Sequence, residues 1–335
     1  TNGSNHKFTG NIIAVGGITE DIMFYVNDLL ILNNPKIKDG RKLLVFPEGD
    51  KIISDSVVFY ADGGGGANTA VSFARLGLNT ALIGAIGEDY SADSSFRRLK
   101  KAGINTALIQ KFSGIRCGLS LIVTAKNKND HVIFTNRAAN EKLKITADSL
   151  KNIHAKGIYL SSLSGPYWQS NLNTLFNWAT KNKIPIAWNP GSAELAKGLK
   201  ALKKYFKRTE LLIVNKDEAT ELALSAGIKK QDLPALLELL GSSGPKLASI
   251  SDGAKGAWII DGIKSYYQPA LKVKVKNTTG AGDAFGSSLF GGLMIYNGNI
   301  QKALKLALIR SCAVVTKIGA QTGLLTLKAS EKTLK

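Results

Sequence analysis

From residue 78 onward, short apolar runs alternate with longer segments whose apolar residues recur at helical spacing. Parallel strands need a long crossover connection, usually a helix, so this alternation is typical of parallel strands buried between helices. The sequence therefore predicts an α/β fold, with a mostly parallel sheet covered by helices on both faces. The expected helices include 91–102 and 168–181. The expected strands are 12–16, 80–84, 157–160, 184–188, 211–214 and 247–251. A further strand, 257–260, is expected to pair with 247–251.

Two stretches interrupt this alternation, residues 22–62 and 115–138. They contain β-like runs, and the second has a turn-like tip at 126–129. We expect a small extra sheet above the main one, inserted in a single domain that spans residues 1–335. A sheet in that place can act as a lid that excludes water from a site beneath it. The β-like runs are 24–26, 51–60, 117–124 and 131–135.

The net charge of +19 raises the question of a nucleic-acid or membrane partner. The lysines are scattered in small groups, without the interleaved aromatic residues of a base-stacking platform, so we expect no specific nucleic-acid partner. No apolar run approaches the ~20 residues of a membrane span, and we expect a cytoplasmic protein without a membrane partner. The two cysteines, Cys117 and Cys312, lie far apart in apolar stretches and are expected to be reduced core thiols.

A glycine-rich turn at residues 277–283 carries the clearest chemical signal. A β-like run, 271–276, precedes it, and small residues at helical spacing follow it. A strand, a glycine-rich turn and a helix start together form an anion site, because unpaired N–H groups and the helix dipole favour negative charge. Asp283 at the edge of this site would repel an anion. A carboxylate there suits the removal of a proton beside a phosphate, so the turn predicts phosphoryl transfer with Asp283 as the base.

A second glycine-rich segment, 63–77, contains four glycines followed by a helix that ends near Gly77. Asn68 lies just inside this helix, and its amide offers a donor and an acceptor to a polyhydroxylated ligand. Near the N-terminus, the strand 12–16 ends in a glycine pair, and Asp21 follows. Ligands of open α/β sheets bind beyond the C-terminal ends of the strands. Asp21 could therefore accept hydrogen bonds from substrate hydroxyls, or it could be a turn aspartate.

Two later strand ends carry polar groups, at 215–218 and 252–256. Asn215 and Glu218 are three residues apart and share one face of a helix's first turn. They could hold the water shell of Mg²⁺, or they could cap the helix. The sequence has neither a Gly-x4-Gly-Lys-Ser/Thr phosphate loop nor a Gly-x-Gly-x-x-Gly dinucleotide motif.

Taken together, these segments resemble the PfkB, or ribokinase-like, carbohydrate kinases. Residues 278–285 resemble the family's C-terminal signature, and residues 63–77 its N-terminal signature. Asn215-x-x-Glu218 matches the magnesium-linked Asn-x-x-Glu motif, and residues 251–256 resemble the nucleotide-binding Gly-Ala-Lys-Gly turn. The four motifs occur in the family's order between about residues 12 and 325. The resemblance implies a ribokinase-like three-layer α/β/α fold with a β-sheet lid, and ATP-dependent phosphorylation of a hydroxyl on a sugar-like small molecule.

The resemblance also assigns roles by position. Asp283 resembles the catalytic base, and the N–H groups of Gly280, Ala281 and Gly282 resemble the anion hole. The positions that hold substrate hydroxyls are matched by Asp21, Gly64, Asn68 and Asn140. The nucleotide contacts are matched by Asn215, Ser251, Gly253, Gly256, Thr279 and Ser311. Mg²⁺ is expected near Asn215 and Glu218, and a monovalent cation such as K⁺ near Asn277 and Thr279.

Four points stay open at the level of sequence. The family's C-terminal signature begins with aspartate, whereas this chain has Asn277, which removes a charge beside the expected cation site. Arg137 is either a loop residue in solvent or a partner for a phosphate or carboxylate on the substrate. The acceptor could be a nucleoside if aromatic residues of the lid stack a base, and a non-catalytic nucleotide or sugar sensor is the alternative outside the enzymes. The lid's open strand edges could also pair two copies into a homodimer. The aromatic residues of the lid that could stack a base are Phe24, Tyr25, Phe59 and Tyr60.

Overall fold

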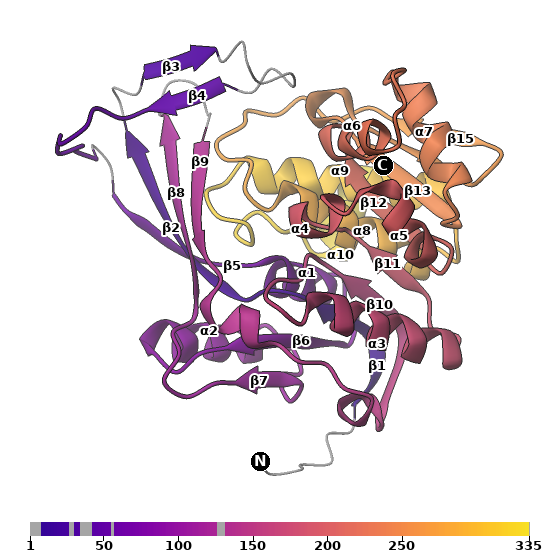
Figure 1. Cartoon of the computed structure of the whole chain (residues 1–335), viewed down its shortest axis with the longest axis horizontal. Coiled ribbons are helices and arrows are strands. Elements are labelled where there is room, and N and C mark those ends of the chain that lie inside the picture. The colour runs from indigo at the N-terminus through magenta and orange to yellow at the C-terminus, as the bar shows by residue number, and fades with distance from the viewer. Residues whose placement is uncertain (1–7, 27–29, 34–41, 55–56, 126–130, 335) are drawn as a thin grey trace.

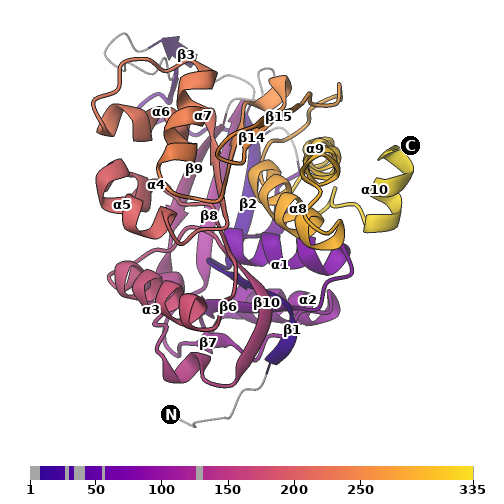
Figure 2. The ribbon, with the colours of Figure 1, turned by 90° about the vertical axis from the view of Figure 1, so that its right-hand side faces the viewer.

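The computed structural model describes residues 8–26, 30–33, 42–54, 57–125 and 131–334. Its main body is a three-layer sandwich, with one twisted sheet between two layers of helices (Figures 1 and 2). The central sheet has the strand order β15-β14-β13-β12-β11-β10-β1-β6-β7. All neighbours pair in parallel except β13–β14 and β14–β15. The strands are β1 (Phe8–Val15), β6 (Thr80–Ile86), β7 (Ile109–Lys111), β10 (Ile153–Leu160), β11 (Ile186–Trp188), β12 (Leu211–Asn215), β13 (Leu247–Ser251), β14 (Ala257–Ile260) and β15 (Ser265–Gln268).

The helices cover both faces of this sheet, as the alternating pattern predicts. Successive residues of β1 point to opposite faces, so Ile13 and Val15 enter one core while Ile12 enters another. The first face carries α3 (Trp168–Lys181), α4 (Ser192–Leu195), α5 (Gly198–Phe206), α6 (Lys216–Ser225) and α7 (Leu233–Ser242). The second carries α1 (Gly65–Arg75), α2 (Tyr90–Lys101), α8 (Ala281–Ile295) and α9 (Ile300–Val315), and α10 (Leu327–Leu334) packs on α9. Short 3-10 helices occur at Ala138–Lys142, Asp148–Leu150 and Gly253–Lys255.

A separate small sheet stands beside the main body, with the strand order β5-β2-β8-β9 (Figure 1), and is called the lid below as a name for these strands alone. Its strands are β2 (Thr19–Val26), β5 (Phe59–Gly63), β8 (Gly118–Ala125) and β9 (His131–Asn136). β3 (Leu30–Asn33) and β4 (Lys42–Val45) form a further antiparallel pair. Both segments that interrupt the βα pattern therefore contribute strands. The expected tip at 126–129 lies outside the described residues, and 51–54 form no strand.

One expected strand is wrong. Residues 271–276 do not join a sheet, although Leu and Val alternate with Lys in this segment. All six residues are exposed, so there is no covering layer to bury the apolar side of a strand. The end of the segment is held by a helix terminus instead, because the N–H of Lys276 donates to the carbonyl of Val315 over 2.8 Å. The glycine-rich turn is thus approached by an extended segment rather than by a strand.

Candidate active site

The glycine-rich turn forms the N-terminus of α8, and Asp283 is the third residue of this helix. Gly280 precedes the helix with φ 78°, in the left-handed region that favours glycine. A Cβ there would also lie 2.6 Å from the Cα of Ala320, in the loop between α9 and α10. Both restrictions exclude a side chain at 280. Of the N–H groups expected to form an anion hole, that of Ala281 already donates to the carbonyl of Thr278 over 3.2 Å.

Asp283 meets the other glycine-rich segment directly. The Nδ2 of Asn68, in α1, donates to Oδ2 of Asp283 over 2.8 Å, although the two residues are 215 positions apart. Burial raises the pKa of Asp283, while the hydrogen bond from Asn68 lowers it. A Cβ on Gly65 would lie 3.5 Å from Oδ1 of Asp283, at ordinary contact distance, but only 2.9 Å from the Cβ of Ser161, so Ser161 restricts side chains at the start of α1. The two signatures of the sequence therefore border one carboxylate.

Asp21 brings a second carboxylate to this region from the lid. It lies in β2, is buried, and accepts a hydrogen bond from Oγ1 of Thr19 over 3.1 Å. Burial raises the pKa of Asp21 to about 6, against hydrogen bonds from Thr19 and Ser120. The negative charge of Asp283 contributes to this rise. The charge of Asp283 thus reaches Asp21, which suits a hydroxyl compound bound between the two carboxylates.

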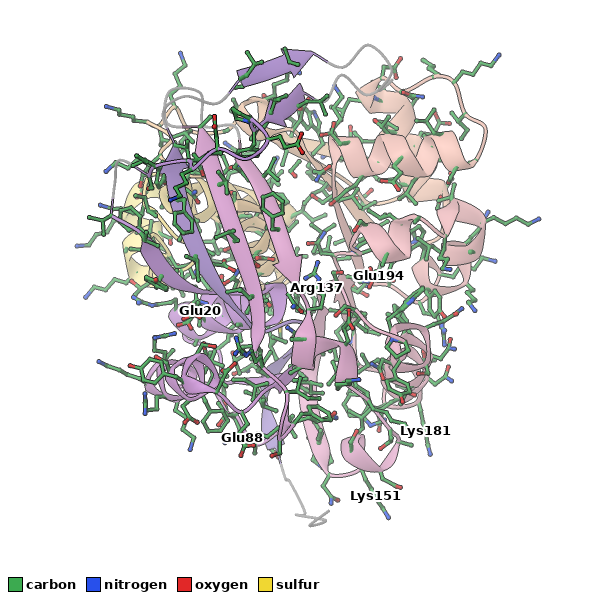
Figure 3. The ribbon with its side chains drawn as sticks, turned by 60° about the vertical axis from the view of Figure 1, so that its left-hand side comes forward. Glu20, Glu88, Arg137, Lys151, Lys181 and Glu194 are labelled. Carbon is green, nitrogen blue, oxygen red and sulfur yellow. The ribbon has the colours of Figure 1, made fainter. Side chains whose placement is uncertain are left out.

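The remaining residues expected on the substrate side have different surroundings. Gly64 caps α1 with φ 89°, and a Cβ there would lie 2.7 Å from the carbonyl carbon of Gly17. Asn140 is buried, and both ends of its amide bond to the backbone of Ile18, at 2.9 and 2.8 Å. The amide of Asn140 therefore fixes the turn before β2. Arg137 is exposed and lies at the end of β9, on the side of the lid next to the main body (Figure 3).

A mostly apolar pocket of about 490 Å³ lies on the other side of the turn, between α8, α9 and the segment 270–275. Its size falls within the range of small-molecule sites. Gly253 and Ser311, two of the expected nucleotide contacts, line it, as does Thr278 beside Thr279. Ser311 donates to the carbonyl of Ala281 over 2.9 Å, which ties α9 to the start of α8. The segment that failed to form a strand is one wall of this pocket.

Two further expected nucleotide contacts surround the turn after β13. Ser251 is the last residue of that strand, and Gly256 closes the turn with φ 100°. A Cβ on Gly256 would lie 2.8 Å from the Cα of Pro269. Glycine at 256 therefore lets the segment that leads to the pocket pass close to this turn.

Asn215 and Glu218 form a reciprocal cap at the start of α6. The N–H of Asn215 donates to Oε2 of Glu218 over 2.8 Å, and the N–H of Glu218 donates to Oδ1 of Asn215 over 2.9 Å. Burial, with smaller contributions from the nearby carboxylates Glu221 and Asp217, raises the pKa of Glu218 to about 7. The capping role considered from the sequence is present, and it leaves Oε1 of Glu218 for another ligand.

The residues expected to hold a monovalent cation lie just before the turn. Asn277 is buried, and its Oδ1 accepts the N–H of Thr279 over 2.9 Å. Within the described part of the chain, the buried Oγ1 of Thr279 has no hydrogen-bond partner. A cation held by neutral oxygens fits this unpaired hydroxyl. Among the described residues, no group of three or more His, Cys, Asp or Glu side chains could hold a metal ion.

Three residues at the site carried no signal in the sequence. Gln321 donates from Nε2 to Oδ1 of Asn68 over 3.0 Å. Ser161, at the end of β10, has a buried hydroxyl with no partner among the described residues, 3.1 Å from where a Cβ on Gly65 would lie. Arg310 is fully buried behind α8 and donates to the hydroxyls of Ser72 and Ser288 over 2.8 and 2.7 Å. Burial lowers the pKa of Arg310 to about 9. Only their positions in space identify these residues.

Comparisons with known proteins agree with this architecture. The model of the pfkB family carbohydrate kinases matches residues 38–327. A ribokinase from Lactococcus lactis is 29% identical over 278 residues, which cover 82% of this chain and 85% of the relative. A ribokinase from Cryptococcus neoformans, solved in complex with ADP, superposes with a TM-score of 0.76 at 24% identity, over 97% of this chain and 100% of that one. A nucleoside kinase from Methanocaldococcus jannaschii superposes with a TM-score of 0.76 at 22% identity, over 98% and 99% of the two chains.

The fold confirms the expected ribokinase-like arrangement of a mostly parallel sheet, two helix layers and a separate small sheet. Among the described residues, no helix is both long and apolar enough to cross a membrane. The family match extends over most of the chain and includes all four sequence motifs. The chain therefore belongs to the pfkB family of carbohydrate kinases, phosphotransferases whose acceptor is a hydroxyl group.

Proposed function

We propose that this protein transfers the γ-phosphoryl group of ATP to a hydroxyl of a small sugar or sugar derivative, with Asp283 as the base. The observation that carries the proposal is the 2.8 Å hydrogen bond between Asn68 and Asp283. It joins the two glycine-rich segments at the N-terminus of α8, where the helix dipole favours a phosphoryl group. A sugar kinase needs a base and an anion site side by side, and this contact supports that arrangement.

The proposed reaction follows from the positions of the groups. Asp283 in its ionised form takes the proton of the acceptor hydroxyl, whose oxygen forms a bond to the γ-phosphorus. The bond from that phosphorus to the oxygen of the β-phosphate breaks, and ADP leaves. N–H groups at Gly280, Ala281 and Gly282 stabilise the transferring phosphoryl group. To do so, the N–H of Ala281 must replace its hydrogen bond to the carbonyl of Thr278 with one to the phosphoryl group. Catalysis by this route consists mainly of positioning and charge stabilisation.

The two substrates would occupy opposite sides of Asp283. Asp21 and Asn68 border the acceptor side, and Gly64 lets the backbone approach it. The pocket beside Ser311 takes the nucleotide base, with Ser251, Gly253 and Gly256 at its strand end. Thr279 and Asn215 are the other two residues that would contact the nucleotide. Asn140 contributes by holding the turn before β2, and it retains one N–H and one lone pair for a hydroxyl.

Metal ions fit the residues present on the nucleotide side. Mg²⁺ prefers oxygen ligands and keeps several waters, which suits Oε1 of Glu218 and the side chain of Asn215 as contacts through water. A pKa near 7 leaves Glu218 partly protonated at neutral pH, and a nearby cation would keep it ionised. When bound, Mg²⁺ screens the phosphate charge. Asn277 and Thr279 would hold K⁺ through neutral oxygens.

The acceptor is more readily a sugar than a nucleoside because the aromatic residues of the lid are divided between two faces. Met23 of β2 pairs with Phe59 of β5, and Ile22 pairs with Tyr60. Tyr25 and Phe59 contact each other edge to face at 6.0 Å, on the same face as Asp21. Phe24 and Tyr60 point to the other face. A nucleoside base could therefore stack only on the first pair. Arg137, exposed at the end of β9, would select a phosphorylated or acidic sugar.

The test is an assay of ATP-dependent ADP formation across sugars, sugar acids, sugar phosphates and nucleosides, with wild type and Asp283→Asn. We expect one acceptor class to be turned over. With that acceptor, the Asn variant should be slower by about 10²–10⁴-fold and should keep its nucleotide affinity. Wild-type turnover by the variant would refute Asp283 as the base. ATP binding without turnover of any acceptor would favour a sensor.

The outer face of the lid supports a homodimer as a further part of the proposal. Four apolar side chains form one row across the sheet, because Ile22 pairs with Tyr60 and Leu121, and Leu121 pairs with Phe134. Tyr60 is 68% exposed and Phe134 is 52% exposed, on a face that Figure 3 brings forward. Light scattering should report a dimer for wild type and a monomer for Phe134→Lys. Tyr267→Lys, an exposed position on β15, should remain a dimer, and a monomeric wild type would contradict the pairing.

A cytoplasmic location also belongs to the proposal. The use of ATP and the two buried free thiols, Cys117 and Cys312, support it. Fractionation of cells that express the protein would test it, and recovery outside the cytoplasm would refute it.

A further inference from the structure

Gln321 belongs to a chain of three hydrogen-bonded side chains that ends at Asp283. Its Nε2 donates to Oδ1 of Asn68 over 3.0 Å, and Nδ2 of Asn68 donates to Oδ2 of Asp283 over 2.8 Å. Gln321 lies in the loop between α9 and α10, and Asn68 lies in α1. Three segments that are far apart in the sequence therefore meet in one polar chain with a fixed direction.

That direction matters because an asparagine amide can turn by 180° and exchange its donor and acceptor. In one orientation Asn68 gives Asp283 an N–H, and in the other it presents an oxygen to the carboxylate. The first favours the ionised form of Asp283, and the second favours the protonated form. Asn68 is buried, so water does not replace a lost partner. Gln321 donates from Nε2, which matches the first orientation because it needs the amide oxygen on the near side of Asn68. The amide of Gln321 can turn as well, so the chain keeps this direction because the ionised carboxylate at its end accepts only an N–H.

The loop that carries Gln321 is itself fixed against the reaction site. Ala320, the preceding residue, packs against Gly280, where a Cβ would lie 2.6 Å from its Cα. A Cβ on Gly319 would lie 3.4 Å from the Cβ of Ala61 in β5 and 3.8 Å from the Cε of Met23 in β2. The loop thus contacts both the start of α8 and the lid. Gln321 is placed by the same packing that places the turn before Asp283.

We propose that Gln321 is a positioning residue for the phosphoryl transfer, which holds the Asn68 amide in the orientation that gives Asp283 a hydrogen-bond donor. This inference rests on the proposed role of Asp283 as the base. It adds a residue that touches neither the acceptor nor the nucleotide and acts through Asn68 alone.

The charged surroundings of Asp283 are the background for a test by pH. Among the described residues, Asp21 from the lid and Tyr159 from β10 feel its charge, which raises the pKa of each. Arg310 lies behind α8, separated from Asp283 by Ser72 and Ser287. The side-chain hydrogen bond that Gln321 makes within the described residues goes to Asn68 and to none of these groups. A change at Gln321 that moves the acid limb of the rate profile must therefore act through Asn68 or through a charge introduced at 321.

The experiment measures kcat against pH for Gln321→Met and Gln321→Glu, each in the wild-type and the Asn68→Ala background. Methionine removes the donor without adding charge, and we expect kcat at neutral pH to fall by about five- to tenfold. Glutamate above its pKa only accepts, so it should turn the Asn68 amide. We expect the acid limb to move up by about one pH unit. In the Asn68→Ala background, either change should alter kcat by less than about twofold and leave the acid limb in place.

Equal effects in both backgrounds would overturn the inference, because Gln321 would then act through its charge or through the loop. Gln301→Glu, the same change on an exposed position of α9, should leave the profile unchanged. Each variant should unfold within about 2 °C of its parent, and a larger loss would show that Gln321 serves stability instead. If Asp283→Asn retains turnover, the proposed base is wrong. If Asp283→Asn is inactive and Gln321→Glu has the wild-type profile, only the present inference fails.

Discussion

Replacing Gly280 and Gly282 separately with alanine gives a matched test of the turn before Asp283. The two residues differ sharply in surroundings. Gly280 has φ 78°, and a Cβ there would collide with Ala320. Gly282 is exposed in the first turn of α8, and a Cβ there would meet nothing within 4 Å. The same added methyl group is therefore excluded by the fold at one position and accepted by it at the other.

The magnitudes follow from these surroundings. At 280, the left-handed conformation costs a side chain about 1–2 kcal/mol, and forcing the loop away from the new methyl costs about 1–3 kcal/mol. Unfolding of 335 residues has an entropy of about 0.7 kcal/mol/K, so Gly280→Ala should lower Tm by about 3–7 °C. Gly282→Ala gains up to about 1 kcal/mol of helix propensity, and its Tm should stay equal or rise by about 1 °C.

Activity should separate from stability in the second variant. If the N–H of Gly282 faces the transferring phosphoryl group, a methyl group beside it occupies space that the substrates need. Gly282→Ala should then lose at least about tenfold in kcat/KM, which corresponds to about 1.4 kcal/mol, although its fold is intact. Scanning calorimetry and a coupled ADP assay measure the two quantities. Wild-type kcat/KM for Gly282→Ala would show that this face of the turn is not the phosphoryl site, and an unchanged Tm for Gly280→Ala would refute the steric reasoning.

The remaining predictions concern carboxylates whose pKa is raised by burial. Asp21 has a folded pKa of about 6, above its ordinary value of 3.8, so the folded state binds more protons between these values and loses stability as pH rises through them. Asp21→Asn should therefore raise the free energy of unfolding at pH 7.5 by up to about 3 kcal/mol, with little change at pH 3.5. Urea unfolding at the two pH values measures this difference in the free energy of unfolding, and an equal change at both would contradict the raised pKa of Asp21. Glu218→Gln keeps an acceptor for the N–H of Asn215 but removes the charge, so the Mg²⁺ concentration for half-maximal rate should rise about tenfold. Asn215→Ala should instead lose about 1 kcal/mol of stability with the cap, and an unchanged Mg²⁺ dependence in Glu218→Gln would exclude the metal role.

Much of the fold follows from local patterns in the sequence. Apolar runs bounded by turn residues mark β6 and β12, and helical spacing marks α3 from Trp168 to Lys181. The segment 271–276 shows where this reasoning fails. Alternating apolar and lysine residues satisfy the pattern of a half-buried strand, but a strand needs a neighbour and a covering layer, and neither is encoded locally. The tertiary structure instead uses the segment as a pocket wall.

The chemistry of the site follows from the sequence only in part. Glycine positions are informative because their steric reasons are local, as at Gly280, where φ and packing both demand glycine. Carboxylates and amides are less informative, because the same residue types cap helices, close turns and bind ligands. Asn215 and Glu218 can perform both roles considered for them, since the cap uses one oxygen of Glu218 and leaves the other.

Three of the asparagines in the site, Asn68, Asn140 and Asn277, show what decides such cases. Asn140 bonds with both ends to the backbone of Ile18, Asn277 accepts the N–H of Thr279, and Asn68 bridges two side chains. In Asn140 and Asn277 the amide orders a turn, and at Asn277 the neutral amide oxygen is sufficient to accept the N–H of Thr279. Asn68 differs because neither of its partners is backbone. Its orientation therefore depends on Asp283 and Gln321 rather than on the local fold, and this contact brings a glutamine 253 positions away into the same site.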